Sequence, residues 1–551
     1  MTKILYQSTV TELGQIYDSN YCFTVTVIIA ILGDMNATHV PVLIVGAGVG
    51  GLATSALLAR HGVGSLLVEK RSEVFIYPKA RNLSFRSLEI LRGLGLSDEV
   101  HAIADEVSAL AVKPALNSPD ERPAIDVHAI FAGLDKLSPE PAAQYCPQSR
   151  LEPMLLAETR RHGSEVRYGT ELSSLDLDDA GATAVLRDRE SGESETVRAD
   201  YLIGADGVHG QVRKWLGVSA SGYGALPIYV VFIYFRAPWR KLVPQLGDGD
   251  GIQVKNPDVD GIFLVARDDL GMFVTTYFPG KGEAANQFTP QRCREVLTKA
   301  FGEPMDIDII ETAAWQPYEQ VAEQFRCGRA FLVGDAAHTM PPFKAGGANT
   351  AIQSAHNLAW KLAAVLGGTA GPGLLDTYQA ERHPVGRFAA RQSLSGPTYA
   401  LLPQSGDRPL LPAEEECSMF SLLIGYRYCS AAVLTDEPPV DPDALQLVEE
   451  LRAQPGTRVP HVWVREGVST LDVLGHGFTL LTGDERWCAA AASASVDAHC
   501  IRSDEWAAAT GLGPSGALLV RPDDFVGWRA EELPADPERQ LHQALSAILC
   551  R

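Results

Sequence analysis

A glycine-rich turn between a strand and a helix constrains the fold of this chain more than any other feature. Val42 to Val45 is a short apolar run, and Gly46-Ala-Gly48-Val-Gly50-Gly51 follows it directly, before apolar residues at helical spacing. A second apolar run, from Ser65, ends at Glu69 and completes a βαβ unit of about 30 residues. The pattern predicts an α/β domain with a parallel sheet that binds a dinucleotide.

Each residue of this motif has a physical role in binding a dinucleotide. Gly46 permits the tight turn, Gly48 lets the backbone approach a pyrophosphate, and Gly51 lets the helix pack closely on the strand. Glu69 accepts hydrogen bonds from ribose hydroxyls, and its charge disfavours a ribose 2′-phosphate. The helix N-terminus adds a partial positive charge that attracts the phosphates.

Two further segments place a carboxylate at the end of an apolar strand. Phe331-Leu-Val-Gly334-Asp335-Ala-Ala-His338 precedes a glycine-containing loop and a helix predicted over 349–366. Asp335 either holds the hydroxyls of a ribityl chain or caps a helix, and the residues alone allow both. Tyr201 to Ile203 leads in the same way to Asp206-Gly207, which on its own would be an ordinary turn.

The chain has 551 residues, which is enough for several cores at about 150 residues per domain. Its β-rich runs begin near Tyr223, and the stretch from Ser395 to Glu416 contains four prolines and three consecutive glutamates. We therefore expect an N-terminal extension over 1–38, a discontinuous dinucleotide-binding domain over 39–400 with an inserted β-sheet layer around 223–317, a linker over 401–440 and a last domain over 441–551. Met35 precedes the first clear strand, so residues 1–34 are expected to be dispensable.

Charge and cysteine content exclude several classes of partner. There are 47 basic and 68 acidic residues, and the net charge of −21 would repel a phosphate backbone, so no nucleic-acid partner is expected. The longest early apolar stretch, residues 21–32, is shorter than the roughly 20 residues of a membrane-spanning helix, so no membrane partner is expected. The nine cysteines form no C-x-x-C pair, which predicts reduced thiols, a cytoplasmic protein and no metal site.

At this order and spacing, the three segments resemble the class A flavoprotein aromatic hydroxylases of the para-hydroxybenzoate hydroxylase fold. The similarity is greatest to the bacterial branch that acts on phenols and aromatic polyketides and carries a thioredoxin-like third domain. Further matching stretches are Pro78–Arg81, Ser87–Gly95, Pro147–Glu152, Ala355–Leu362, Leu375–Pro384 and Pro455–His461. The resemblance implies a Rossmann-like FAD-binding domain interleaved with a β-rich substrate domain, followed by a C-terminal thioredoxin-like α/β domain that cannot exchange dithiols.

The resemblance also implies which residues bind the cofactor. Those for the adenosine and pyrophosphate part of FAD are Gly46, Gly48, Gly51, Glu69 and Arg81. Gln148 would hold the ribityl region, and Asp335 the ribityl chain and the pyrophosphate. Asp206 and Gly207 are associated with both FAD and the nicotinamide nucleotide, and the residues beside the isoalloxazine are Pro342, Gly347 and Asn349. No side chain is expected to act as a catalytic acid or base, and His338 is expected to be structural.

Three positions depart from the family pattern. Gly210 stands where a serine is usual, and Ser354 stands where an aspartate usually precedes the Ala-His-Asn triplet. Phe343-Lys344-Ala345-Gly346 replaces a run of small residues beside the flavin, and Lys344 is expected to be a solvated loop lysine.

The implied reaction is the hydroxylation of a phenolic or polycyclic aromatic substrate, with NADPH or NADH and O2, through a flavin C4a-hydroperoxide. Water must be excluded from such a site, so the substrate would lie in an apolar cavity against the β-rich layer. Candidate residues there are Tyr229, Phe232, Tyr234, Phe273 and Tyr277, about half of which should face away. A Baeyer–Villiger oxygenase and a non-catalytic flavin-containing binding protein remain alternatives, and the protein is expected to be a monomer or homodimer.

Overall fold

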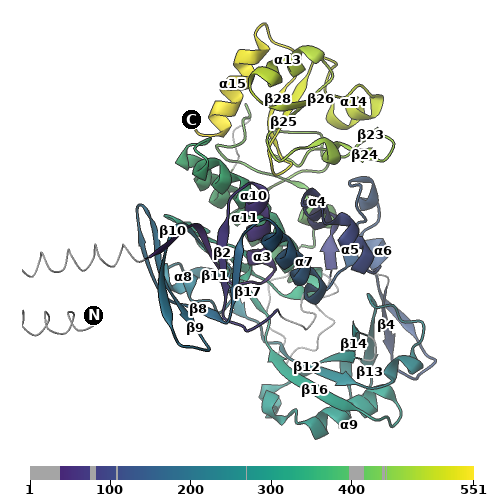
Figure 1. The fold of residues 1–551 in the computed structure, drawn as a ribbon. Helices are drawn as coiled ribbons and strands as arrows, with labels where there is room; N and C mark the ends of the chain where they lie inside the picture. The colour runs from purple at the N-terminus through teal and green to yellow at the C-terminus, as the bar shows by residue number, and fades with distance from the viewer. Residues whose placement is uncertain are drawn as a thin grey trace, which may run out of the picture.

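The computed structural model describes residues 37–74, 82–106, 109–267, 270–395, 415–436, 441 and 444–551. Most of the expected N-terminal extension and much of the expected linker lie outside these ranges, as does Arg81. The described chain forms three parts arranged in a row, with a layered α/β part in the middle, a β-rich part at one end and the C-terminal domain at the other (Figure 1).

The middle part is built on a sheet in which strands from distant segments lie side by side. Its main path runs β18-β19-β10-β1-β2-β7, and β8 and β9 extend it from β10. The strands are β1 (Thr38–Val45), β2 (Ser65–Glu69), β7 (Glu165–Tyr168), β8 (Thr170–Asp178), β9 (Gly181–Asp188), β10 (Ser194–Gly204), β18 (Arg326–Cys327) and β19 (Ala330–Leu332). Because β19, β10, β1, β2 and β7 are parallel, the three strand-end segments found in the sequence meet at one edge.

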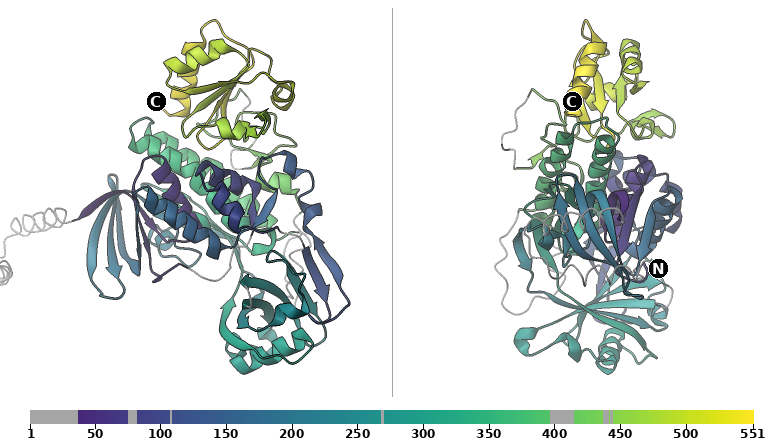
Figure 2. Two further views of the ribbon diagram at one scale, coloured as in Figure 1. Left: turned by 45° about the vertical axis from the view of Figure 1, so that its right-hand side comes forward. Right: turned by 60° about the vertical axis from the view of Figure 1, so that its left-hand side comes forward.

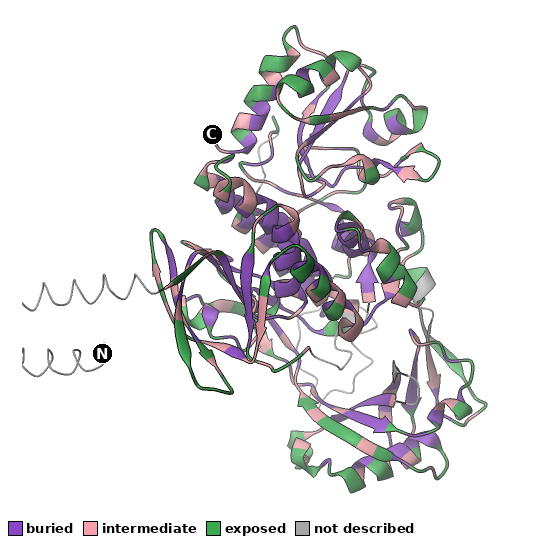
Figure 3. Ribbon diagram, viewed as in Figure 1, coloured by how far each residue is buried: buried purple, intermediate pink, exposed green. Residues whose placement is uncertain are grey.

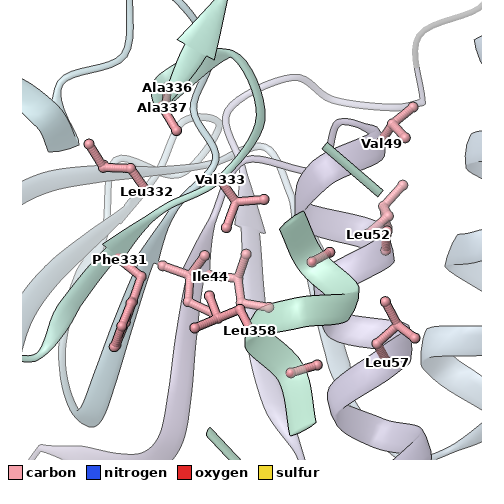
Figure 4. Packing of buried hydrophobic residues seen from close by; sticks show 14 of the residues in the cluster. Ile44, Val49, Leu52, Leu57, Phe331, Leu332, Val333, Ala336, Ala337 and Leu358 are labelled. Carbon is pink, nitrogen blue, oxygen red and sulfur yellow. The ribbon is translucent and has the colours of Figure 1, made fainter. Parts of the chain in front are cut away.

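Helices cover this sheet and bury its apolar residues. They are α3 (Val49–Arg60), α7 (Gln148–Arg161), α10 (Gly346–Leu366) and α11 (Asp376–Gln392). Figure 4 shows Ile44 of β1 between Leu358 of α10 and Val333, with Leu52 of α3 beside them. The long helix expected over 349–366 is present as α10 and begins three residues earlier, at Gly346.

Shorter elements complete the middle part. Two small sheets join β3 (Asn82–Ser84) to β6 (Ala143–Tyr145), and β11 (Ala220–Ala225) to β17 (Tyr318–Ala322) and β20 (His338–Thr339). The short helices are α4 (Phe85–Gly93), α5 (Ser97–Ile103), α6 (Val127–Ile130), α8 (Val212–Trp215) and α12 (Met419–Leu423).

The β-rich part is a seven-stranded sheet in the order β16-β12-β15-β14-β13-β4-β5, backed by α9 (Pro290–Phe301) (Figure 2). Its strands are β4 (Ala109–Lys113), β5 (Arg122–Asp126), β12 (Tyr229–Arg236), β13 (Gly251–Lys255), β14 (Asp260–Arg267), β15 (Leu270–Tyr277) and β16 (Asp308–Trp315). The inserted strands thus begin at Tyr229 rather than near 223, and the sheet also includes β4 and β5 from an earlier segment where no strand was predicted.

The C-terminal domain has a mixed sheet with the order β26-β25-β27-β28. The strands are β25 (Thr479–Thr482), β26 (Asp497–Cys500), β27 (Ala517–Val520) and β28 (Val526–Ala530), and the helices are α13 (Glu485–Ser493), α14 (Asp504–Thr510) and α15 (Pro537–Ile548). Helices on a mixed four-stranded sheet agree with the expected thioredoxin-like fold. The peripheral hairpins are β21 (Tyr426–Arg427) with β22 (Gln446–Leu447), and β23 (Trp463–Arg465) with β24 (Val468–Ser469).

Burial follows this division into three parts. The central strands of the large sheets and the inner faces of the long helices are buried, whereas strands such as β8 and β16 and the outer helix faces are largely exposed (Figure 3). None of the helices in the described ranges is both long and apolar enough to cross a membrane.

Candidate active site

The glycine-rich turn joins β1 to α3 at the carboxyl edge of the central sheet. Gly46 has a φ of 107°, and a Cβ there would lie 2.3 Å from the carbonyl oxygen of Ala205. At Gly51, a Cβ would lie 1.9 Å from the carbonyl oxygen of Gly46. The nearest atom to a Cβ at Gly48 would be Oε1 of Glu152, at 3.9 Å. Packing of the described residues therefore requires glycine at 46 and 51 but not at 48, where the turn borders open space.

Glu69 ends β2 beside this turn and is 6% exposed. One carboxylate oxygen, Oε2, accepts from the Ala47 amide at 2.8 Å, and Oε1 accepts from the amide and Nε of Arg71, each at 3.0 Å. Burial favours the neutral acid, but the hydrogen bonds from Arg71 and Ala47 outweigh burial and hold the pKa of Glu69 below its usual value. The site therefore contains a charged carboxylate in a fixed orientation.

The first turn of α7 lies on the other side of the turn. Gln148 donates from Nε2 to Oε1 of Glu152 at 2.5 Å, and Glu152 is fully buried. Since this same Oε1 is the atom nearest to a Cβ at Gly48, Gln148 and Gly48 border one space.

Asp206 follows β10 and directs its carboxylate into its own loop. Its Oδ2 accepts from the Val212 amide at 3.0 Å, and its buried Oδ1 has no hydrogen-bond partner among the described residues. Burial raises the pKa of Asp206. A Cβ at Gly210 would lie 2.2 Å from the carboxyl carbon of Asp206, so the glycine found in place of the usual serine makes room for this carboxylate. Gly207 supplies the turn between them with a φ of 83°.

Asp335 is exposed and lies in a 3-10 turn over Gly334–Ala336, which follows β19. Its Oδ1 is 4.0 Å from the position of a Cβ on Gly347, in the first turn of the 21-residue helix α10. The N-cap position of α10 is occupied by Ala345, not by Asp335. Gly50 of α3 packs on Gly334, with 3.5 Å between its Cβ position and the Gly334 Cα, so this carboxylate borders the glycine-rich turn.

The loop before α10 differs from the sequence expectation at Lys344. Pro342 is exposed, but the Lys344 side chain is only 6% exposed and its Nζ lies 2.9 Å from Oε1 of Glu416. Lys344 is therefore a partly enclosed, ion-paired residue and not a solvated lysine. Ala345 adopts the left-handed conformation, with a φ of 53°, which non-glycine residues rarely take.

Asn349 connects the first turn of α10 to the segment Asn82–Ser87. Its Oδ1 accepts from the Ser84 amide at 2.9 Å and from the Ser87 hydroxyl at 2.6 Å. Its Nδ2 donates to the carbonyl oxygens of Asn82 at 3.0 Å and Ala345 at 2.7 Å. The side chain is thus engaged within the protein and holds α10 in place beside the predicted cofactor site.

The five candidate aromatic residues divide between the two faces of the β-rich sheet. Phe232 and Tyr234 lie in one apolar cluster with Trp315, and the ring centroids of Phe232 and Trp315 are 5.9 Å apart. Leu394, directly after α11, belongs to the same cluster, so this face looks toward the middle part of the molecule. The other three residues lie on the opposite face, which packs on α9, and are Tyr229, Phe273 and Tyr277.

His338 and Ser354 form a buried polar chain with Arg382. The Ser354 hydroxyl accepts from Nε of Arg382 at 3.1 Å and lies 3.4 Å from Nε2 of His338. Burial lowers the pKa of His338 to about 3, so this imidazole is neutral. Among the described residues, no carboxylate forms an ion pair with Arg382, and its other side-chain partners are the hydroxyls of Tyr426 and Tyr428. The serine at 354 therefore leaves a fully buried guanidinium with neutral partners.

Comparison with known families assigns this architecture. A family profile described as an FAD binding domain matches residues 39–393, and one described as the C-terminal domain of aromatic-ring hydroxylases matches residues 452–551. The chain belongs to the FAD-binding aromatic-ring hydroxylases.

Relatives of this hydroxylase cover nearly its whole length. The tetracenomycin A2 monooxygenase-dioxygenase of Streptomyces glaucescens is 36% identical, over 94% of this chain and 98% of the relative. The 4-methyl-5-nitrocatechol 5-monooxygenase of a Burkholderia species is 37% identical, over 93% and 98%. The solved structure of aklavinone-11 hydroxylase with FAD and aklavinone matches with a TM-score of 0.83 and 35% identity, over 94% of this chain and all of that chain. The resemblance seen in the sequence is therefore confirmed, and the protein is a flavin-dependent aromatic hydroxylase.

Three residues of the hydroxylase site were not predicted as site residues from the sequence. Arg71 fixes Glu69, Glu152 holds Gln148, and Trp315 packs beside Phe232. Arg71 had a weak signal, because a residue two positions along an extended segment can lie on the same side as the carboxylate. No sequence signal indicated Trp315, since its neighbour across the sheet depends on the register of β16 with β12.

Proposed function

We propose that this hydroxylase binds FAD along the carboxyl edge of its central sheet and hydroxylates a phenolic or polycyclic aromatic substrate of polyketide type, with NADPH or NADH and O2 as co-substrates. The observation that carries this proposal is the convergence at one edge of the open turn at Gly48, the fixed carboxylate of Glu69, and Asp335 beside the N-terminus of α10. A cytoplasmic location and a monomeric or homodimeric state are part of the same proposal.

The described residues fit FAD. Glycine at 48 is not required by the protein's own packing, so backbone amides there are accessible to a pyrophosphate. Three short hydrogen bonds hold Glu69, and a fourth contact, from Nη2 of Arg71, is 3.4 Å long. A ribose hydroxyl would replace this long contact. Gln148 and Asp335 would hold the ribityl chain, and Gly347 would leave room for the ring beside the N-terminus of α10.

The aromatic face of the β-rich sheet supports the assignment of the substrate class. Phe232, Tyr234 and Trp315 form a surface of stacked and tilted rings on the side toward the cofactor domain. A planar aromatic ring system would pack against these residues by offset or edge-to-face contact. The named relatives act on both a polycyclic polyketide and a single-ring nitrocatechol, so the number of fused rings is left to the experiment.

In this proposal, the side chains of the site bind and orient the cofactor and the substrate. Bound FAD would supply the redox chemistry: with two electrons from the nicotinamide nucleotide, one atom of O2 would go to an electron-rich ring carbon and the other would leave as water. Phe232, Tyr234 and Trp315 exclude water from the reacting ring. The nearby His338 is fully buried and neutral, which agrees with a structural role.

The test is a substrate screen with labelled oxygen. The purified protein should be yellow, and phenols or aromatic polyketides should stimulate its consumption of NADPH in air. With 18O2, one labelled atom should be found on a ring carbon. A label inside a lactone would instead indicate a Baeyer–Villiger reaction, and FAD binding with no stimulation by any aromatic compound would indicate a binding protein.

A pair of variants on β12 tests the substrate face. Phe232→Ala should raise KM for the aromatic substrate about tenfold or more, because its ring belongs to the proposed substrate surface. Tyr229→Ala is the matched control, since this ring lies on the opposite face of the same strand. Equal effects of the two substitutions would refute the proposed position of the substrate.

A further inference from the structure

A cluster of buried charges joins the C-terminal domain to the two long helices of the FAD-binding domain. It consists of Asn357 and Lys361 of α10, Glu381 of α11, and Arg521 and Asp523 from the turn between β27 and β28. We call it the interdomain charge cluster. The side chains of its four charged members are at most 1% exposed.

The hydrogen bonds of this cluster are short and cross the domain boundary in several places. Arg521 donates from Nη1 and Nη2 to the two oxygens of Glu381, at 2.6 and 2.8 Å. Lys361 donates to the same carboxylate at 2.7 Å, and Asn357 donates to Oδ2 of Asp523 at 2.9 Å. Arg521 also binds Asp523, at 2.5 Å. Glu381, Arg521 and Asp523 therefore each have hydrogen-bond partners in both domains.

Each domain supplies one cation and one anion, and the hydrogen bonds of Arg521 to Glu381 and of Asn357 to Asp523 form only when the domains are docked. Two cations, Lys361 and Arg521, face two anions, Glu381 and Asp523. Burial lowers the pKa of Lys361 to about 8, and the carboxylate of Glu381 opposes this shift. Removing one partner of a buried ion pair leaves an uncompensated charge, which is strongly destabilising, whereas the intact pair adds specificity of geometry.

A second set of contacts connects the C-terminal domain to the N-terminal end of α10. Arg86 of α4 donates to the carboxylate of Asp524 and to the carbonyl oxygen of Asp523, both at 2.8 Å. The next residue of α4, Ser87, donates to Asn349 in the first turn of α10 at 2.6 Å. The C-terminal domain thus holds α10 directly at Asn357 and, through α4, at Asn349.

These contacts give a role to a domain whose sequence predicted only that it cannot exchange dithiols. The positions contacted on α10 are within ten residues of Gly347, or about 15 Å along the helix axis at 1.5 Å per residue. A rigid helix transmits a displacement over this distance, so the position of its N-terminus depends on the docked domain.

We propose that Arg521 and Asp523 are positioning residues for the cofactor-facing end of α10, and that the C-terminal domain serves as a fixed support for the FAD site. This inference rests on the proposed function, because it places the N-terminus of α10 beside the flavin. It predicts that disturbing the interdomain charge cluster changes the environment and retention of FAD, although no atom of the cluster belongs to the proposed FAD contacts.

The experiment compares holoenzyme variants of matched stability. Arg521→Met removes the charge and keeps the length of the side chain, and Arg521→Lys is the conservative variant. Leu518→Ala is the control, because Leu518 is fully buried in a core cluster made only of C-terminal residues and should lower the melting temperature without touching α10. The readouts are the rate of FAD release after dilution, the visible circular dichroism of the bound flavin, and the melting temperature.

Arg521→Met should release FAD at least tenfold faster than the wild type and alter the flavin dichroism, and Arg521→Lys should restore most of both. Leu518→Ala should resemble the wild type in these flavin readouts despite its lower melting temperature. If Arg521→Met behaves like Leu518→Ala, the inference is overturned. If Arg521→Met does not fold, the isosteric Asp523→Asn takes its place, with the same two outcomes. A wild-type protein that retains no FAD would overturn the proposed function itself, and with it this inference.

Discussion

Replacing Gly48 with alanine should weaken FAD binding while leaving the apo-protein nearly as stable as the wild type. Gly48 has a φ of −79°, which alanine adopts readily, and the nearest atom to the added methyl group would be 3.9 Å away. Gly51→Ala is the matched contrast, because its methyl group would lie 1.9 Å from the carbonyl oxygen of Gly46. The two glycines are three residues apart. A methyl group at 51 would clash with the protein's own backbone, whereas a methyl group at 48 would enter only the space proposed for the pyrophosphate.

The structure separates the magnitudes of the two effects. At an N-cap, alanine is less favourable than glycine by about 0.5–1 kcal/mol, which sets the expected loss of apo-protein stability for Gly48→Ala. Losing one hydrogen bond to a charged pyrophosphate costs about 1.5–3 kcal/mol, so the dissociation constant of FAD should rise about tenfold to 150-fold. Gly51→Ala overpacks the turn and should cost about 1–3 kcal/mol of stability before any ligand is added.

The assay is a titration of apo-protein with FAD followed by flavin fluorescence, together with urea unfolding of each apo-variant. Gly48→Ala should have a larger effect on the dissociation constant of FAD than on the free energy of unfolding. Gly51→Ala should already lower the free energy of unfolding of the apo-protein. An unchanged dissociation constant in Gly48→Ala would show that the pyrophosphate does not approach this turn.

Three other substitutions test separate parts of the site. Asp335→Ala should weaken FAD binding about tenfold to a hundredfold through loss of a charge-assisted hydrogen bond. A lower melting temperature with an unchanged dissociation constant would show that Asp335 has a purely structural role. Because the pKa of Glu69 lies below its ordinary value of 4.5, its ionised form stabilises the fold above pH 4.5, and this stabilisation is lost as the pH falls through the folded-state pKa. Glu69→Gln should therefore be less stable than the wild type in urea unfolding at pH 7, and the difference should shrink below pH 4.5; a constant difference would refute this. Ser354→Ala should lower the free energy of unfolding by about 1–3 kcal/mol, because it leaves Nε of the buried Arg382 without its acceptor, and an unchanged urea midpoint would contradict the assigned hydrogen bond.

The features that could be predicted from the sequence were those set by local chemistry. A strand, a turn that requires glycine at 46 and 51, and a helix follow one another within 23 residues, so their spacing reveals them without knowledge of the rest of the chain. The three strand-end segments could also be recognised from the sequence, and the parallel pairing of their strands in the structure brings them to one edge.

Features that depend on pairing between distant segments were harder to predict from the sequence. Alternation along β12 predicted that aromatic residues would divide between two faces, but the face that carries Phe232 is fixed by the partners β15 and β16 and by α9. Lys344 was expected to be solvated because its partner, Glu416, lies 72 residues along the chain. An ion pair over such a separation leaves no pattern in a single sequence.

The interdomain charge cluster also limits how such enzymes can be recombined. A chimera that joins the first 395 residues of this chain to the C-terminal region of a relative would take Asn357, Lys361 and Glu381 from one parent and the residues at 521 and 523 from the other. If the second parent placed different charges at 521 and 523, Glu381 would lose its ion pair with Arg521 and Asn357 its hydrogen bond to Asp523, both in a fully buried position. Exchange of substrate-binding strands alone, from 229 to 315, leaves all five cluster residues in their parental context and should give folded hybrids far more often.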